Sequence, residues 1–188
     1  MKFRDTMGRQ KKFLILFFIT SIVLTCCVRK DYPPILFDIT QVPTATKGKV
    51  VEFFYRDSIK THSFSELTQN KVVIITFWGS WVAACQRQIR TMAELWEEYA
   101  GRDLVIIGMN VDTSVNLGFK VRKHLEGNKI PYVNFLATSE IIDGYGGITT
   151  IPTTILIDKE GKVLAKIEEE KTKSELKDYL SKIFERSY

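Results

Sequence analysis

Cys85 is the side chain in the body of this sequence that is best placed to do redox chemistry. It follows an apolar, β-branched run, Val72–Trp78, which predicts a strand buried on both faces. Gly79 and Ser80 interrupt that run, and a helical pattern begins near Ala83. A cysteine in the first turn of a helix lies near unpaired N–H groups and the positive end of the helix dipole, which stabilise a thiolate. The strand, turn and helix therefore predict a position at which a thiol can react.

The helical neighbours of Cys85 indicate a sheltered thiol instead. Gln88 and Ile89 lie one turn further along the predicted helix, and Met92 lies one heptad away, so the cysteine falls on an apolar stripe. Burial raises the pKa of a thiol. The helix dipole contributes only about 0.3–1 kcal/mol, which is less than one pKa unit at about 1.36 kcal/mol each. Two interpretations follow: a small buried core residue, or a slow single-thiol reaction.

Two segments resemble the membrane-anchored thioredoxins of the TlpA/ResA type. Residues 77–85, FWGSWVAAC, resemble the F-W-x-x-W-C-x-x-C active site, and residues 147–162, GITTIPTTILIDKEGK, resemble the segment G-x-x-x-I-P-T-T-x-L-I-D-x-x-G-K. The resemblance covers roughly Lys49–Tyr188 and implies a thioredoxin-like fold and membership of the thiol-disulfide oxidoreductases. There is one large departure. The first, nucleophilic cysteine of the family falls at Val82, and only the second is present, as Cys85.

This departure predicts impaired dithiol exchange, because one cysteine must attack the target disulfide and another must resolve the mixed disulfide. Cys26 and Cys27 are poor substitutes, since they belong to the N-terminal leader. The alternative is a single-thiol protein that uses Cys85 for monothiol exchange or as a peroxiredoxin-like peroxidase. The peroxiredoxin motif P-x-x-x-T-x-x-C places Trp78 and Val82 where its proline and threonine belong, which disfavours the peroxidase. A third hypothesis is that a partner supplies the second thiol.

The resemblance also implies a surface that binds protein partners or substrates. Pro152 resembles the family's cis-proline, and the backbone before it, at Ile151, pairs in the family with an extended segment, as in strand addition. Trp81 resembles the exposed tryptophan of the active site. The plain alternatives are a turn proline that starts a strand and a half-buried aromatic residue. The predicted partner surface therefore comprises Trp81, Cys85, Ile151 and Pro152. Thr76 stands where thioredoxins often carry a buried acid that assists proton transfer.

The N-terminal leader predicts a location outside the cytoplasmic membrane. A charged segment, residues 1–12, precedes the uncharged and mostly apolar Phe13–Thr25, whose length suits a secretory signal and is short for a membrane span. Cys26 and Cys27 follow at once, and the sequence before them resembles a bacterial lipobox, so we expect one of the two to be lipidated. The alternative is an uncleaved anchor that ends near Val28. Both interpretations place the domain in the cell envelope, membrane-anchored on the extracytoplasmic (periplasmic) side.

Composition completes the domain plan and excludes some functions. We interpret residues 1–27 as the signal peptide, 28–48 as a proline-containing tether, and 49–188 as the thioredoxin-like domain. The formal net charge is +5, of which residues 1–25 carry +4, so the remaining chain is nearly neutral and lacks the basic surface of a nucleic-acid binder. His62 and His124 do not match metal-ligand spacing with each other or with Cys85. The sequence predicts no metal and no cofactor.

Alternating strands and helices predict an α/β fold with a central mixed sheet flanked by helices. The last helix has a capping box at its start, formed by Thr172 and Glu175. From the hydrophobic periodicity we expect, besides the central strand, helices at 83–99, 114–125 and after 172, and strands at 50–55, 104–111, 132–136, 153–158 and 162–167.

Overall fold

The computed structural model describes residues 36–44 and 48–186, which belong to one compact unit, Asp31–Tyr188. The predicted signal peptide, its two cysteines Cys26 and Cys27, and the first part of the predicted tether lie outside the described residues. No helix among the described residues is long and apolar enough to cross a membrane.

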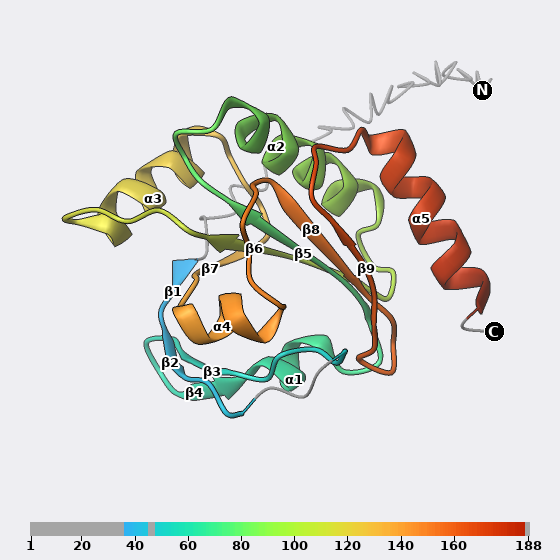
Figure 1. Ribbon diagram of the computed structural model, residues 1–188, viewed down its shortest axis with the longest axis horizontal. Coiled ribbons are helices and arrows are strands. Elements are labelled where there is room, and N and C mark those ends of the chain that lie inside the picture. The colour runs from blue at the N-terminus through green and yellow to red at the C-terminus, as the bar shows by residue number, and fades with distance from the viewer. Residues whose placement is uncertain (1–35, 45–47, 187–188) are drawn as a thin grey trace, which may run out of the picture. The chain divides into compact units, whose positions relative to one another are not determined.

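A six-stranded sheet organises the domain (Figure 1), and it confirms the predicted mixed α/β class. The first four strands in spatial order are parallel to one another, the fifth is antiparallel to them, and the sixth is antiparallel to the fifth. All seven residues of the strand after Lys71 are buried, as the β-branched composition predicts. The strands, in spatial order, are β1 (Leu36–Phe37), β7 (Val133–Leu136), β6 (Leu104–Asn110), β5 (Val72–Trp78), β8 (Thr153–Ile157) and β9 (Val163–Ile167).

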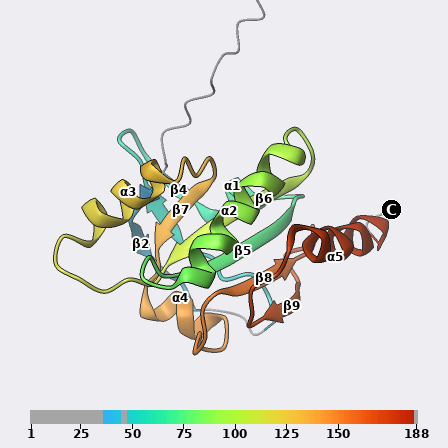
Figure 2. The ribbon, with the colours of Figure 1, turned by 90° about the horizontal axis from the view of Figure 1, so that it is seen from above.

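Helices cover both faces of this sheet (Figures 1 and 2). One face packs against α2 (Ala83–Glu98), α3 (Leu117–Gly127) and α5 (Lys173–Arg186). The other face packs against α1 (Phe64–Thr68), α4 (Ser139–Gly144) and a three-stranded sheet of β2 (Ile39–Gln41), β3 (Phe54–Arg56) and β4 (Thr61–Ser63). Two apolar layers therefore fix the central strand and the helix that follows it.

The predicted capping box at the start of α5 is confirmed. The backbone N–H of Thr172 donates to Glu175 Oε2 at 2.9 Å, and the backbone N–H of Glu175 donates to Thr172 Oγ1 at 3.3 Å. These two bonds satisfy donors that the first turn of a helix leaves unpaired, so they define where α5 begins.

The segment predicted as a tether contributes strands to both sheets, which corrects its boundary. Leu36 pairs with Asn134 of β7, and Ile39 pairs with Tyr55 of β3. Leu36 is buried, and the Phe37 ring lies 5.2 Å from the ring of Tyr55. The folded unit therefore begins by residue 36. Strands of two and three residues carry too little hydrophobic periodicity to be recognised, and their pairing depends on distant partners.

Candidate functional site

Val82 and Cys85 occupy the start of α2, and both are apolar in character. Val82 is the N-cap residue, with an extended backbone (φ −100°, ψ 117°) and no side-chain capping bond. Cys85 is completely buried in the core with Ile89 and Met92, which confirms the predicted apolar stripe. It is the single cysteine among the described residues, and it is free. The described residues thus offer one thiol, and the N-cap position, where Val82 packs partly buried against the core, carries none.

The surroundings of Cys85 keep its thiol protonated. Burial raises the pKa of the Cys85 thiol, and the negative charges of Asp112 and Glu170 raise it further. A hydrogen bond from the backbone of Gly79 opposes this rise but is the smaller influence. Because the thiolate is the nucleophile in disulfide exchange, a raised pKa means a less reactive sulfur at neutral pH.

No buried carboxylate is present among residues 36–44 and 48–186 to accept a proton from the thiol. Thr76 is buried in β5 and pairs in register with Thr154 of β8. Both hydroxyls lack a hydrogen-bond partner among the described residues. Side chains alternate along a strand, so Thr76 faces the same core as Ile74 and Trp78, which is the core that contains Cys85. A threonine pair therefore replaces the acid that would assist proton transfer.

The residues predicted to bind a partner meet around Gly79. A Cβ atom added to this glycine would lie 2.9 Å from Ile151 Cδ1 and 3.0 Å from the Trp81 ring, so both side chains close over it. Trp81 is 63% exposed, which favours a contact residue over a half-buried aromatic. The Ile151–Pro152 peptide bond is cis, as predicted. Ile151 also packs against the core that contains Cys85, so the structure brings the four predicted site residues together.

Asp112 holds the loop of this site in place, and the sequence reasoning missed its role. The backbone N–H of Ser80 donates to Asp112 Oδ1 at 2.8 Å, and Ser80 Oγ donates to Oδ2 at 2.5 Å. The Asp112 backbone N–H in turn donates to Asn110 Oδ1 at 3.1 Å. A signal was available: β5 and β6 are parallel and pair Trp78 with Asn110, so polar residues just beyond their carboxyl ends meet.

The charged segment between β9 and α5 docks against α2 one turn beyond the cysteine. Arg87 Nε and Nη2 donate to the two carboxylate oxygens of Glu170 at 2.8 and 2.6 Å, and the Lys171 backbone N–H donates to Gln88 Oε1 at 2.7 Å. Gln88 is fully buried. A run of charges is normally a solvated segment, so this docking could not be expected from the residue types alone.

A buried polar group beneath the site supports the central strand. Trp78 Nε1 donates to Asn134 Oδ1 at 3.2 Å, and a Cβ atom on Gly108 would lie only 1.8 Å from that oxygen. The His124 ring lies 5.4 Å from the Trp78 ring, and burial lowers the pKa of His124. His62 lies in β4, in the other sheet. The described residues contain no group of three His, Cys, Asp or Glu side chains that could hold a metal ion.

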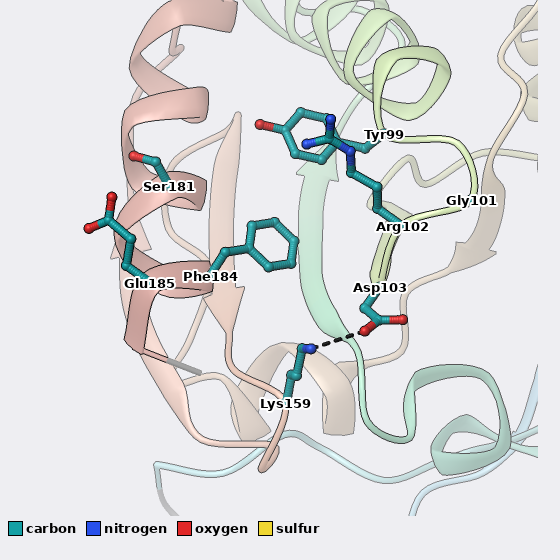
Figure 3. A pocket seen from close by; sticks show the side chains of 8 residues that line it. All are labelled: Tyr99, Gly101, Arg102, Asp103, Lys159, Ser181, Phe184 and Glu185. Atoms are coloured by element: carbon teal, nitrogen blue, oxygen red, sulfur yellow. Dashed lines mark hydrogen bonds and ion pairs between the residues drawn. The ribbon is translucent and has the colours of Figure 1, made fainter. Parts of the chain in front are cut away.

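A separate pocket of about 570 Å³ lies at the other end of α2 (Figure 3). The rings of Tyr99 and Phe184 stack at 6.2 Å, and the Arg102 guanidinium lies 5.0 Å above the Tyr99 ring. An ion pair of 3.0 Å between Lys159 and Asp103 crosses its lower edge in Figure 3. None of the predicted site residues lines this pocket, so it is not part of the site around Cys85.

Comparisons with known proteins agree with the fold and with the motifs. The AhpC/TSA family matches residues 44–166. The chain is similar to the thiol-disulfide oxidoreductase ResA of Bacillus thuringiensis subsp. konkukian, with 36% identity over 116 residues, which are 61% of this chain and 65% of that protein. The chain thus spans slightly less than two thirds of that relative. ResA of Geobacillus kaustophilus is 28% identical over 168 residues, which are 87% of this chain and 93% of that protein.

A solved structure gives the same result for the architecture. The thiol:disulfide interchange protein of the thioredoxin family from Chlorobium tepidum TLS has a TM-score of 0.59 and 26% identity, and the match covers 66% of this chain and 86% of that one. The predicted thioredoxin-like fold is confirmed. Since the family match covers more than half of the sequence, the chain belongs to the AhpC/TSA family.

Proposed function

We propose that this chain is a thioredoxin-like protein of the cell envelope that binds extended segments of partner proteins and does not catalyse dithiol exchange by itself. The observation that carries the proposal is the pair of positions at the start of α2. The N-cap position holds Val82, which has no sulfur and packs partly buried against the core, and the nearby sulfur, on Cys85, is completely buried.

The chemistry of exchange explains why this pair matters. An exposed thiolate attacks one sulfur of the target disulfide and displaces the other as a thiolate, and a second thiol then attacks the mixed disulfide to release the reduced target. Val82 cannot make the first attack. Cys85 could only attack after it becomes exposed and loses its proton, and its raised pKa opposes the latter. Neither half of the cycle is supported by the described residues.

The binding half of the site does not depend on sulfur. Trp81 offers an exposed aromatic face next to Ile151 and the cis Pro152. Ile151 makes no backbone hydrogen bond to another described residue, so its N–H and C=O can pair with an extended segment. We therefore propose that the partner is a polypeptide strand that lies across Trp81 and Ile151.

The location is part of the same proposal. The leader, residues 1–27, has the charge and length of a secretory signal, and it ends in Cys26 and Cys27, either of which can accept a lipid. The similarity to ResA proteins supports a redox ancestry. The proposed protein is held on the extracytoplasmic side of the membrane and presents its binding surface there.

Insulin-disulfide reduction tests the catalytic half. We expect no dithiothreitol-dependent reduction above background with the wild-type chain, and at least about a tenfold gain with Val82→Cys, because that change places a second sulfur at the helix N-terminus, three residues before Cys85. The double variant Val82→Cys/Cys85→Ser is the matched control and should lose multiple turnover. Robust reduction by the wild-type chain would refute the proposal.

Binding of S-carboxymethylated insulin B chain tests the other half, since this unfolded polypeptide cannot form disulfides. We expect the wild-type chain and Cys85→Ala to bind it equally, and Trp81→Ala to bind it at least about tenfold more weakly, as for an aromatic hot spot. Equal binding by the Trp81 variant would show that the proposed surface is not used.

Single-thiol chemistry at Cys85 is the competing function. It requires a thiol that reagents can reach, whereas Cys85 is fully buried and burial raises its pKa. The rate at which iodoacetamide alkylates Cys85 in the native protein decides between the two functions.

A further inference from the structure

The start of α3 exposes large apolar side chains to solvent. Val115 is 82% exposed and Phe119 is 71% exposed, and they lie four residues apart in the loop before α3 and in its first turn. Figures 1 and 2 both show this loop and the first turn of the helix reaching beyond the central sheet. The opposite side of the helix, with Val121 and Leu125, is buried in the core. Large exposed apolar residues close together in the chain indicate an interaction surface.

The same element concentrates positive charge. Residues 115–129 carry Lys120, Arg122, Lys123 and Lys129 against Glu126 alone, a net charge of +3 in a chain that is nearly neutral after its leader. All four cations belong to exposed residues, and none of them has an ion-pair partner among the described residues. Apolar residues surrounded by unpaired lysine and arginine suit a membrane surface with anionic lipids.

The chain enters the folded unit next to this helix. Arg122 Nη2 donates to the carbonyl oxygen of Leu36, the first described residue, at 3.4 Å. Eight residues, 28–35, separate Leu36 from the predicted leader, and such a segment spans at most about 29 Å when fully extended. This step rests on the proposed anchoring. An anchor at Cys26 or Cys27 would keep α3 within that distance of the lipid headgroups.

A further large apolar residue is exposed at the end of the three-stranded sheet where the chain enters the folded unit. Ile59 is 89% exposed in the turn between β3 and β4. β2 and β3 are antiparallel, with Ile39 paired with Tyr55 and Gln41 paired with Phe54. The turn after β3 therefore lies near the beginning of β2, on the side of Leu36, which is where the Arg122 contact is found.

We propose that α3 and the loop before it form a lipid-binding surface that holds the domain against an anionic bilayer. Val115 and Phe119 enter the interfacial layer, and Lys120, Lys123 and Lys129 contact the headgroups. Asp112 lies three residues before Val115 and also holds the Ser80 loop, so the partner-binding site lies close to the bilayer. The surface then favours partners whose extended segments are themselves near the membrane.

Lysine acetylation of the full chain on vesicles tests the proposal. The full chain is mixed with vesicles of phosphatidylcholine that contain about one third phosphatidylglycerol, recovered by flotation, and acetylated, and each lysine is quantified by mass spectrometry. We expect Lys120, Lys123 and Lys129 to react at least about fivefold more slowly than in detergent, because headgroups cover them. Lys177 and Lys182 on α5 serve as internal references and should keep their rates.

Matched variants separate the surface from the anchor. Val115→Ser/Phe119→Ser should abolish the protection while the chain still floats through its leader, and Tyr179→Ser, at an exposed aromatic on α5, should leave the protection unchanged. If the chain floats with the vesicles but its α3 lysines are not protected, the proposed lipid-binding surface is wrong, while the proposed anchor and the proposed peptide binding are unaffected. Protection that survives the double variant, or chains that do not float at all, would also overturn it. A cross-link from residue 119 to another protein, found without lipid protection, would assign the surface to a protein partner instead.

Discussion

The two sides of the site around Gly79 differ in what holds them and in what they offer. On the binding side, Trp81 is exposed and Ile151 lies beside it, both close to the Cα of the glycine. On the thiol side, Val82 caps α2 without a side-chain hydrogen bond, and Cys85 is buried in the core. The binding side thus exposes an aromatic side chain to solvent, whereas the thiol side buries its sulfur.

This difference indicates that recognition and exchange rest on separate parts of the fold. The binding side is positioned by backbone contacts, by the bonds between Ser80 and Asp112, and by the missing side chain of Gly79. Exchange needs a sulfur at the N-cap position of α2, which Val82 occupies. A change at that one residue can remove exchange while every contact that shapes the binding surface remains.

The largest effect on stability is expected from Gly108→Ala, which disturbs the central sheet that supports both sides of the site. A Cβ atom there would lie 1.8 Å from Asn134 Oδ1, which accepts the hydrogen bond from Trp78. We expect a loss of about 3 kcal/mol in the free energy of unfolding, because the core becomes overpacked and a buried hydrogen bond is broken. Guanidinium denaturation followed by tryptophan fluorescence measures it.

Gly118→Ala is the matched control for that variant. Gly118 lies in α3, and an added Cβ atom would meet nothing within 4 Å. We expect a gain of up to about 1 kcal/mol, because alanine favours a helix over glycine. If the Gly108 variant is as stable as the Gly118 variant, the hydrogen bond from Trp78 to Asn134 does not stabilise β5.

The sequence predicted the elements whose residues carry their own pattern. Val72–Trp78 is a continuous β-branched and aromatic run, which is typical of a strand buried on both faces. Ile89, Met92 and Leu95 recur at helical spacing because α2 buries one of its faces. The partner-binding residues were predicted from the motifs around Trp81 and Pro152, and the structure places them together. The predicted roles of these residues in binding stay predictions.

The parts that sequence reasoning missed depend on contacts between distant residues. The Leu36–Asn134 pairing, the Ser80–Asp112 bonds and the docking of Glu170 on Arg87 each join residues more than thirty positions apart. Each uses residue types that are equally common in loops, so no local period marks them. Only the parallel pairing of β5 with β6 could have suggested that Asp112 meets the Ser80 loop.

Asp112→Ala should loosen the binding side of the site. It removes the acceptor for both the N–H and the hydroxyl of Ser80, and the unpaired donors should lower the free energy of unfolding by about 1–3 kcal/mol. Chemical denaturation measures this loss, and binding of carboxymethylated insulin B chain should weaken with it. Asp112→Asn keeps one acceptor oxygen and should lose less. If the two variants are equally destabilised, the hydrogen bonds are not the cause.

Alkylation tests how closed the thiol side is. We expect Cys85 in the native protein to react with iodoacetamide at neutral pH at least about 100-fold more slowly than in the unfolded protein, because reaction requires local opening and a thiolate. Peptide mapping separates this reaction from that of Cys26 and Cys27. Alkylation of native Cys85 at the rate of the unfolded chain would favour the single-thiol function instead.

The pH dependence of stability follows from the same burial. The pKa of Cys85 is raised in the folded protein, so above an ordinary thiol pKa of about 8.5 the unfolded chain loses its proton first. Stability is therefore fully present below that pH and decreases as the pH rises toward the folded pKa. Denaturation curves between pH 7 and pH 10 should show this decrease, and the profile of Cys85→Ala should lack that component. Identical slopes would mean that the folded thiol is not perturbed.

Trp81→Ala should have the smallest effect on stability and is the sharpest test of the separation between the two sides. The side chain is 63% exposed, so we expect the free energy of unfolding to change by less than about 0.5 kcal/mol, as for other surface substitutions. The alkylation rate of Cys85 should also stay the same, because the thiol is covered by core residues rather than by this ring. Affinity for the carboxymethylated B chain should nevertheless fall at least about tenfold, since an exposed aromatic next to a free backbone strand supplies much of the contact energy. If Cys85 in the variant instead reacts faster with iodoacetamide, Trp81 shields the thiol, and the binding side and the thiol side of the site are not independent.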